Sequence, residues 1–185
     1  MKSVAGEILE KVNKINKKEL EDDFIQRTNN HISLVKHFAD ILADYLESKG
    51  ESEKDDANLL RIDASMHDAS KFSESEKDGY IWINAYYNLG IDYPSKKEKK
   101  LADKAWEHHQ KFNNHHPEFW GNCNRMPKYI VAHMIADWKS MEYINPDSMK
   151  LFDFWNQVGK VKYKWDIDHI YWIEDFINVL SKEDV

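Results

Sequence analysis

Apolar residues recur at helical spacing along most of this 185-residue chain. The clearest stretch lies within residues 24–49, where Val35, Phe38 and Leu42 follow one another at intervals of three and four. Glycine and proline, which the turns between strands require, number only six and four. The spacing and this scarcity together predict an all-α fold rather than a β-sandwich or a Rossmann domain.

Start and stop signals divide the chain into about seven or eight expected helices, which we interpret as one helical bundle over residues 1–185. An N-terminal helix (1–24) should pack on a core (25–145), and aromatic-rich helices (146–185) should complete it. Ser73 with Glu76, and Ser95 with Glu98, have the spacing of capping boxes. The expected helices are 2–22, 24–49 ending at Gly50, 54–67, 73–88, 95–112, 129–144 after Pro127, and two that Asp147 and Asp166 cap.

The overall charge and composition exclude several classes of protein. The formal net charge of −7 argues against a general nucleic-acid binder, so the lysines of 96–100 should face solvent. One cysteine cannot make a disulfide framework or a cysteine-based zinc module. Without a signal-like segment or about 18 consecutive apolar residues, we expect a cytoplasmic chain with no membrane partner.

Several helices place a histidine or an aspartate on the face that should be buried. His31 continues the apolar stripe of 24–49, whereas His37 should face elsewhere. His67 continues the stripe of the next helix, with Asp68 beside it where the helix should end. Asp137 lies in the middle of an apolar face, where a carboxylate is costly to bury unless a cation or strong donors meet it.

Each of these residues also has a purely structural explanation. A buried histidine can bond a backbone carbonyl, Asp68 can cap the next turn, and Asp137 can pair with Arg61 or Lys139. The order His, His-Asp, Asp on three separate helices nevertheless matches the imidazole and carboxylate ligands of divalent transition metals. The residues alone leave the structural and the metal-binding explanations open, and a metal site would hold a manganese, iron, cobalt, nickel or zinc ion on His31, His67, Asp68 and Asp137.

These residues, in this order, resemble the HD superfamily of metal-dependent phosphohydrolases, which is helical and named for its His-Asp doublet. The gaps of 36 residues from His31 to His67 and 69 from Asp68 to Asp137 are similar to those of its 5′-nucleotidase branch. Lys71 instead resembles the HDxxK of the HD-GYP branch, since the nucleotidases usually carry a glutamate there. The chain is also similar to an uncharacterised bacterial and phage family with HDxSKF and HHPEFW motifs, here at 67–72 and 115–120.

The resemblance implies hydrolysis of a phosphate ester by metal-bound hydroxide, with a nucleotide as one candidate substrate. Lys71 would hold phosphate, and His109, His115 and His116 would bind a second metal, bind phosphate or donate a proton. The histidine-rich segment can equally be a solvent-facing patch, and His133 can orient a ligand or simply pack. The loop 113–126 with Trp120 can close over a substrate, and Trp120 or Tyr80 can stack on a base.

Other functions remain open on the sequence alone. Some HD proteins are di-iron oxygenases that act on small organic substrates, and this is the second enzyme hypothesis. The third hypothesis is a non-catalytic helical binding or scaffold protein. A homodimer through the aromatic C-terminal helices is an expected partner arrangement, although these helices fit the core better.

Overall fold

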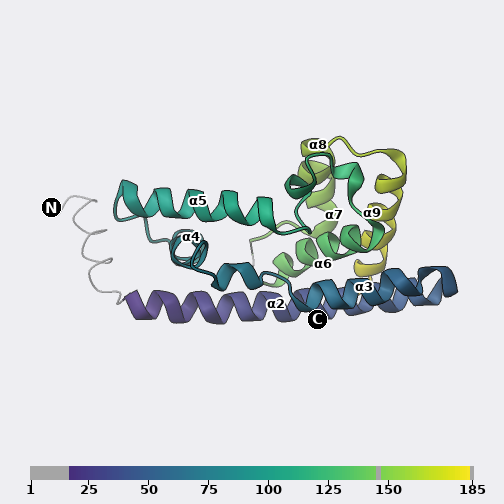
Figure 1. The fold of residues 1–185 in the computed structure, drawn as a ribbon, viewed down its shortest axis with the longest axis horizontal. Coiled ribbons are helices and arrows are strands. Elements are labelled where there is room, and N and C mark those ends of the chain that lie inside the picture. Colours follow the sequence, from purple (N-terminus) through teal and green to yellow (C-terminus); the bar gives the residue numbers. More distant parts are fainter. Residues whose placement is uncertain (1–16, 145–146, 184–185) are drawn as a thin grey trace. The chain divides into compact units, whose positions relative to one another are not determined.

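The computed structural model describes residues 17–144 and 147–183, and these residues are helical with no strand among them (Figure 1). The all-α prediction is therefore confirmed. No helix in these ranges is both long enough and apolar enough to cross a membrane. The elements are α2 (Lys17–Ser48), η1 (Glu51–Glu53), α3 (Lys54–Ser65), η2 (Ala69–Phe72), α4 (Lys77–Leu89), α5 (Lys96–Phe112), η3 (Pro117–Trp120), η4 (Cys123–Arg125), α6 (Lys128–Ile144), α7 (Leu151–Phe154), η5 (Trp155–Gly159), α8 (Lys160–Lys162) and α9 (Ile167–Leu180).

Helix α2 runs without a break for 32 residues, so the predicted boundary between helices at 22–24 is wrong. The reason is a continuous buried stripe, in which Leu20 and Phe24 lead at intervals of four to Thr28, and then to His31 and Val35. The expected helix 2–22 lies mostly in residues 1–16, outside the described residues.

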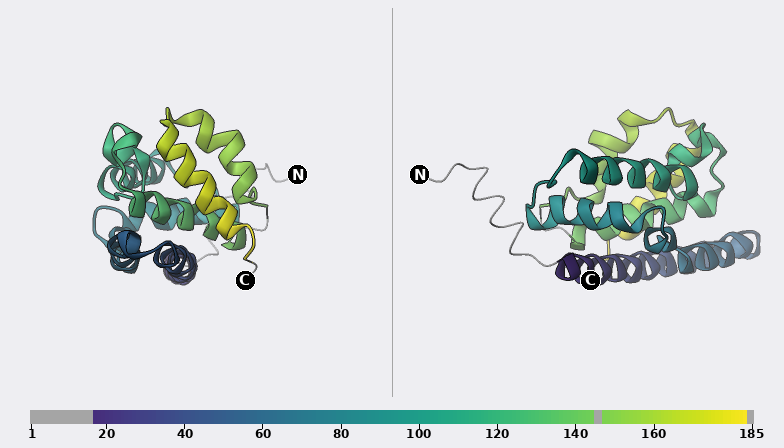
Figure 2. Two further views of the ribbon diagram at one scale, coloured as in Figure 1. Left: turned by 90° about the vertical axis from the view of Figure 1, so that its right-hand side faces the viewer. Right: turned by 60° about the vertical axis from the view of Figure 1, so that its left-hand side comes forward.

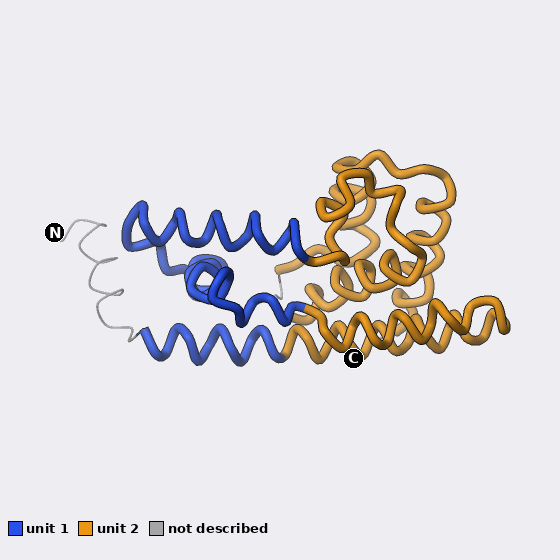
Figure 3. The backbone as a smooth tube through the Cα atoms, in the orientation of Figure 1, with its two compact units in different colours: residues 1–29, 68–112 blue, residues 30–67, 113–185 orange. Residues whose placement is uncertain are grey.

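The chain forms two compact units, drawn in different colours in Figure 3. Unit 1 comprises residues up to Asn29 together with Asp68–Phe112, and unit 2 comprises Asn30–His67 together with the chain from Asn113 onward. The peptide bond between His67 and Asp68 therefore joins one unit to the other. Whether the whole chain behaves as the single domain expected from its length stays a prediction.

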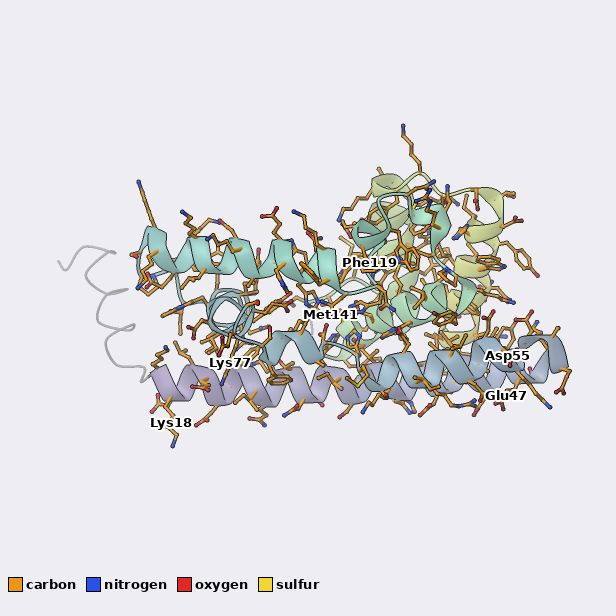
Figure 4. All side chains as sticks on the ribbon, viewed as in Figure 1. Lys18, Glu47, Asp55, Lys77, Phe119 and Met141 are labelled. Atoms are coloured by element: carbon orange, nitrogen blue, oxygen red, sulfur yellow. The ribbon has the colours of Figure 1, made fainter. Side chains whose placement is uncertain are left out.

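Unit 1 packs α4 and α5 against each other and against the first turns of α2. Gly79 on α4 makes this close approach possible, because a Cβ there would overlap the Cβ of Ala105 and the carbonyl of Leu101 on α5. Lys77, labelled in Figure 4, pairs with Glu21 on α2. The buried apolar residues of unit 1 are Leu20, Phe24, Tyr80, Ile81, Ala85, Ile91 and Ala105.

Unit 2 packs α6 against α3 on one side and α9 on another (Figure 2). Gly50, with a φ of 123°, turns the chain from α2 into η1 and α3, a conformation that favours glycine. Figure 4 shows the consequence: Glu47, near the C-terminal end of α2, lies close to Asp55, near the N-terminal end of α3. The largest fully buried side chains of this core are Trp155, Phe38, Phe176, Leu42, Leu46 and Leu60.

Two of the predicted caps form and two do not. Ser95 accepts from the backbone of Lys97 and bonds Glu98 at the start of α5, and Asp166 accepts from the backbone of His169 in α9. The box at Ser73 is wrong, because α4 begins only at Lys77 and makes no side-chain cap bond. Asp147 does not cap α7, which begins at Leu151.

Candidate functional site

Three residues from different segments of unit 2 meet at one point. His31 lies on α2, His67 follows α3, and Asp137 lies on α6. The His31 Nε2 is 3.0 Å from the His67 Nε2, and the Asp137 Oδ1 is 3.2 Å from the first nitrogen and 3.7 Å from the second. All three side chains are at most 14% exposed. The structure thus brings together three of the four predicted metal ligands, which we call the metal triad.

Local sequence explains where the two histidines of the triad point. His31 continues the buried stripe of α2, whereas His37 is exposed, as predicted. Helix α3 ends at Ser65, so His67 lies just beyond the helix. Asp68 follows with a φ of 57° and is the one non-glycine residue with positive φ in the described ranges. This left-handed step allows two adjacent side chains to point in different directions.

A chain of hydrogen bonds fixes which nitrogen of His67 faces the triad. The Asp63 carboxylate, which can only accept, takes a hydrogen bond from the His133 Nδ1 at 2.7 Å. A neutral His133 then has a lone pair at Nε2, and the His67 Nδ1 donates to it at 2.9 Å. The remaining nitrogen of a neutral His67, Nε2, therefore presents a lone pair to His31 and Asp137.

A second chain fixes His31 in the same way. The Ser140 hydroxyl donates its one proton to the backbone carbonyl of Asp137 at 2.7 Å. Its oxygen is therefore an acceptor for the His31 Nδ1, which lies 2.9 Å away. A neutral His31 consequently also presents the lone pair of its Nε2 to the triad.

Two imidazole lone pairs and a carboxylate thus converge on one point, and an arrangement of this kind requires a cation. Two ligands about 2.0–2.1 Å from a tetrahedral zinc ion lie about 3.3–3.4 Å apart. The three observed separations of 3.0, 3.2 and 3.7 Å fall around that value. A proton shared by His31 and Asp137 can meet the same electrostatic need when no metal is bound.

When no metal is bound, protonated histidines supply the positive charge that Asp137 requires. Burial works against ionisation of Asp137, but hydrogen bonding to His31 and the charges of His31 and His67 hold its pKa well below the usual range. Burial, together with the charge of His67, holds the pKa of His115 well below its ordinary value, so its ring is neutral. His67, His115 and His133 form a second group whose ligand atoms lie within 4.8 Å of one another.

The other half of the doublet, Asp68, belongs to unit 1 and contacts a different network. Its Oδ1 is 3.1 Å from the His109 Nε2, and its Oδ2 pairs with Lys71. The His109 Nδ1 lies 2.9 Å from the fully buried Glu76, which also meets His108 at 2.7 Å. Asp68 as a fourth metal ligand stays a prediction.

Glu76 and His109 stabilise each other in their charged forms. Burial opposes ionisation of both groups. Hydrogen bonds from His109 and His108 nevertheless hold the pKa of Glu76 below its ordinary value. Bonds to Asp68 and Glu76 raise the pKa of His109 above its ordinary value. His109 therefore lies as a buried cation between two carboxylates.

The observed contacts do not support the structural explanations that the sequence allows for Asp137 and Asp68. Arg61 pairs with Asp44 and Glu47 of α2, and Lys139 pairs with Glu142, so neither meets Asp137 through these contacts. Asp68 makes no side-chain cap bond to the turn that follows it.

The catalytic candidates are distributed over both units. His109 and Lys71 belong to unit 1, where the Lys71 ammonium lies 4.9 Å above the ring of Tyr80 as well as meeting Asp68. His115 is buried in unit 2, and the ring of His116 packs on it at 4.5 Å. Helix α5 ends at Phe112, so His109 and His116, which are seven residues apart, do not lie on one continuous helix.

The two aromatic residues expected to stack on a base have other contacts. The ring of Tyr80 is 6% exposed and meets the ring of His109 edge-on at 5.2 Å. Trp120 packs on the core of unit 2, and its indole donates to the carbonyl of Asn114 at 2.7 Å. The loop also bonds the segment before α9, since Asn124 donates to the carbonyl of Lys164. Its role as a lid stays a prediction.

Sequence reasoning missed Asp63, Ser140 and Glu76. Asp63 and Ser140 lie on helices without any local pattern that marks them, and only the fold places them beside His133 and His31. Glu76 carried a misleading signal, because its spacing from Ser73 is that of a capping box.

Comparison with known proteins gives one finding. A family model described as a family of unknown function (DUF5662) matches residues 20–178, which is most of the chain. No curated protein and no solved structure matches it.

Proposed function

The chain belongs to the DUF5662 family, whose function is unknown, and we propose that it is a metalloenzyme holding a divalent transition-metal ion on His31, His67 and Asp137. The observation that carries this proposal is the convergence of two imidazole lone pairs and a carboxylate within 3.0–3.7 Å. Two nitrogen ligands and one oxygen ligand suit manganese, iron, cobalt, nickel or zinc. Three protein ligands also leave positions for water and substrate.

We propose hydrolysis of a phosphate ester as the reaction. A divalent ion in the triad would lower the pKa of a coordinated water and polarise a phosphoryl oxygen. Asp63 and Ser140 would keep His67 and His31 in the tautomers that bind a cation. The neutral ring of His115, buried beside His67, would bind a second metal.

Lys71 and His109 belong to unit 1, and their roles as phosphate ligand and proton donor stay predictions from the resemblance. Both side chains already contact Asp68, so a phosphate would have to compete with that carboxylate for Lys71. The order of His31, the His67-Asp68 doublet and Asp137, which resembles the HD phosphohydrolases, supports the same reaction class.

Metal content and activity test the proposal with a matched pair of variants on one helix. We expect about one ion per chain after purification without chelator, and hydrolysis within a panel of phosphate esters supplied with manganese, cobalt or nickel. His31→Gln should lose both, whereas His37→Gln, which changes an exposed histidine of the same helix, should keep both. Absence of metal and of hydrolysis in the unmodified protein would overturn the proposal.

A second candidate function is oxygen chemistry at a pair of irons. It is favoured by the second histidine group, because His115 and His133 add two buried imidazoles beside His67, and the His133 Nε2 would bind iron in place of its hydrogen bond from His67. Two irons per chain and oxygen consumption with a small organic substrate would mark this function. A binding or scaffold protein, in contrast, would lose stability but no chemistry on His67→Ala.

A further inference from the structure

Unit 1 contains a pocket of about 410 Å³ that the proposed metal chemistry does not use. Its aromatic walls are Tyr86 and Tyr87 at the end of α4, Tyr93 in the turn that follows, and Trp106 on α5. Small-molecule sites in proteins are concave, mostly apolar and about 300–1,000 Å³ in volume, and this pocket falls in that range. We call it the aromatic–lysine pocket, because Lys99 lies at its rim.

The rings of this pocket form a corner of two flat surfaces. Tyr86 and Tyr93 stack with an angle of 11° between their planes and 4.9 Å between their centres. Tyr87 stands almost perpendicular to Tyr86, at 86° and 5.0 Å. Tyr87 is 73% exposed and Trp106 47% exposed, so about half or more of each residue is open to solvent. A flat aromatic ligand that stacks here would remove that area from water.

Lysines concentrate beside the rings. The Lys99 ammonium lies 5.6 Å from the centre of the Tyr93 ring, and an adjoining hollow shares Tyr93 and Lys99 and is lined further by Lys96 and Lys100. Over residues 96–104 the chain has five lysines and two acidic residues, although its net charge is −7. Some positive charge is cancelled locally, because Lys99 pairs with Asp103 at 2.7 Å. Asp92 and Asp103 also line the hollow, so its three lysines leave one net positive charge there.

We propose that the aromatic–lysine pocket binds a small flat aromatic molecule that carries an anionic group, of which a nucleoside monophosphate is the simplest biological form. The tyrosines and Trp106 offer stacking surfaces for the ring system, and Lys96, Lys99 and Lys100 lie where they can meet the anion. The size of the pocket suits one nucleotide. The net charge of −7 disfavours a long polyanion.

The test is the binding of AMP to the full chain in the presence of a chelator, measured by calorimetry beside adenosine and inorganic phosphate. AMP should bind at least about ten-fold more tightly than either, because only AMP offers both the ring and the charge. Tyr87→Ala should weaken AMP and adenosine by about five-fold or more, the lower end of the value of one stacked base. Tyr171→Ala is the matched control, since Tyr171 is 68% exposed on α9.

A second pair of variants isolates the charge. Lys99→Ala should weaken AMP several-fold and leave adenosine unchanged. Lys111→Ala removes a lysine from the same helix with an equivalent pairing to an acid four residues away, and it should change neither. The proposal is overturned if AMP binds no more tightly than adenosine, or if Tyr87→Ala and Tyr171→Ala behave alike. Loss of AMP binding in His31→Gln would also overturn it, because the nucleotide would then belong to the metal triad.

Discussion

Replacing Asp137 by asparagine tests the central feature of the metal triad with the smallest change of shape. The substitution keeps the size of the side chain but removes the negative charge that lies 3.2 Å from the His31 Nε2 and 3.7 Å from the His67 Nε2. The two imidazole nitrogens remain, and two neutral ligands hold a divalent ion much less tightly than two neutral ligands and an anion. We expect Asp137→Asn to fold and to lose most of its metal affinity.

The size of the effect follows from linkage between binding and folding. A metal present at about one hundred times its dissociation constant stabilises the folded protein by about 2.7 kcal/mol. In a chain of this length about 1 kcal/mol corresponds to roughly 2–4 °C of melting temperature. The unmodified protein should therefore gain about 5–11 °C when the metal is added after chelator treatment. Asp137→Asn should gain almost nothing.

The assay is thermal unfolding of chelator-treated protein with and without manganese, cobalt, nickel or zinc, followed by elemental analysis. Glu142→Gln is the control, since it removes a more buried carboxylate from the same helix that pairs with Lys139 and Lys150. This variant should lower the melting temperature of the metal-free protein but keep the gain on metal addition. A full metal-induced gain in Asp137→Asn would refute the assignment of this carboxylate as a ligand.

Three further predictions concern the groups around the site and the packing of unit 1. Ser140→Ala removes the acceptor of the His31 Nδ1 proton and should lower metal affinity by about 10–100-fold in a competition titration. Gly79→Ala forces a Cβ into α5 and should destabilise the protein by about 1–3 kcal/mol in urea unfolding, and a neutral result would contradict the close packing. The lowered pKa of Glu76 gives stability that is full above pH 4.5 and falls in acid, while the raised pKa of His109 gives stability that is full below pH 6.5 and falls in base. Metal-free stability should therefore contain a contribution that is greatest between these two values. Glu76→Gln should remove its loss in acid and weaken its loss in base, because Asp68 still raises the pKa of His109.

The helices were largely predictable because their causes are local. The stripe of α2 and the cap at Ser95 each depend on residues a few positions apart, and both were identified. The break expected at 22–24 was wrong because polar residues there face outward while the buried stripe continues past them. Glu76 was misinterpreted for a related reason. Its distance from Ser73 is a local signal, whereas its partner His109 lies 33 residues further along.

The site residues were predictable where a polar side chain that is costly to bury interrupts an apolar stripe. His31 and Asp137 break stripes that would otherwise be apolar, and the structure places them 3.2 Å apart. Asp63 breaks no such pattern, since it lies on a polar position of α3 and is only partly buried. Its contact with His133 spans 70 residues, so the tautomer that it fixes is a property of the fold alone.

A hydrogen-bonded pair of a carboxylate and a histidine holds each residue of the His67-Asp68 doublet. A carboxylate fixes a histidine on each side: Asp63 acts through a ring that meets His67, and Glu76 acts through a ring that meets Asp68. The left-handed backbone at Asp68 is the step that sends the two side chains to separate networks. Conformations of this kind persist where the surrounding contacts hold them and are common at functional sites.

This parallel gives a way to decide whether Asp68 is a metal ligand. Asp63→Asn should lower metal affinity about 10–100-fold, because it removes the charge that fixes the ring beside His67. If Asp68 also binds the ion, Glu76→Gln should lower metal affinity by a similar factor. The effects of Asp63→Asn and Glu76→Gln would then both appear in one competition titration. If Asp68 only stabilises unit 1, Glu76→Gln would reduce stability and leave metal affinity unchanged. The metal triad would then hold the ion without Asp68.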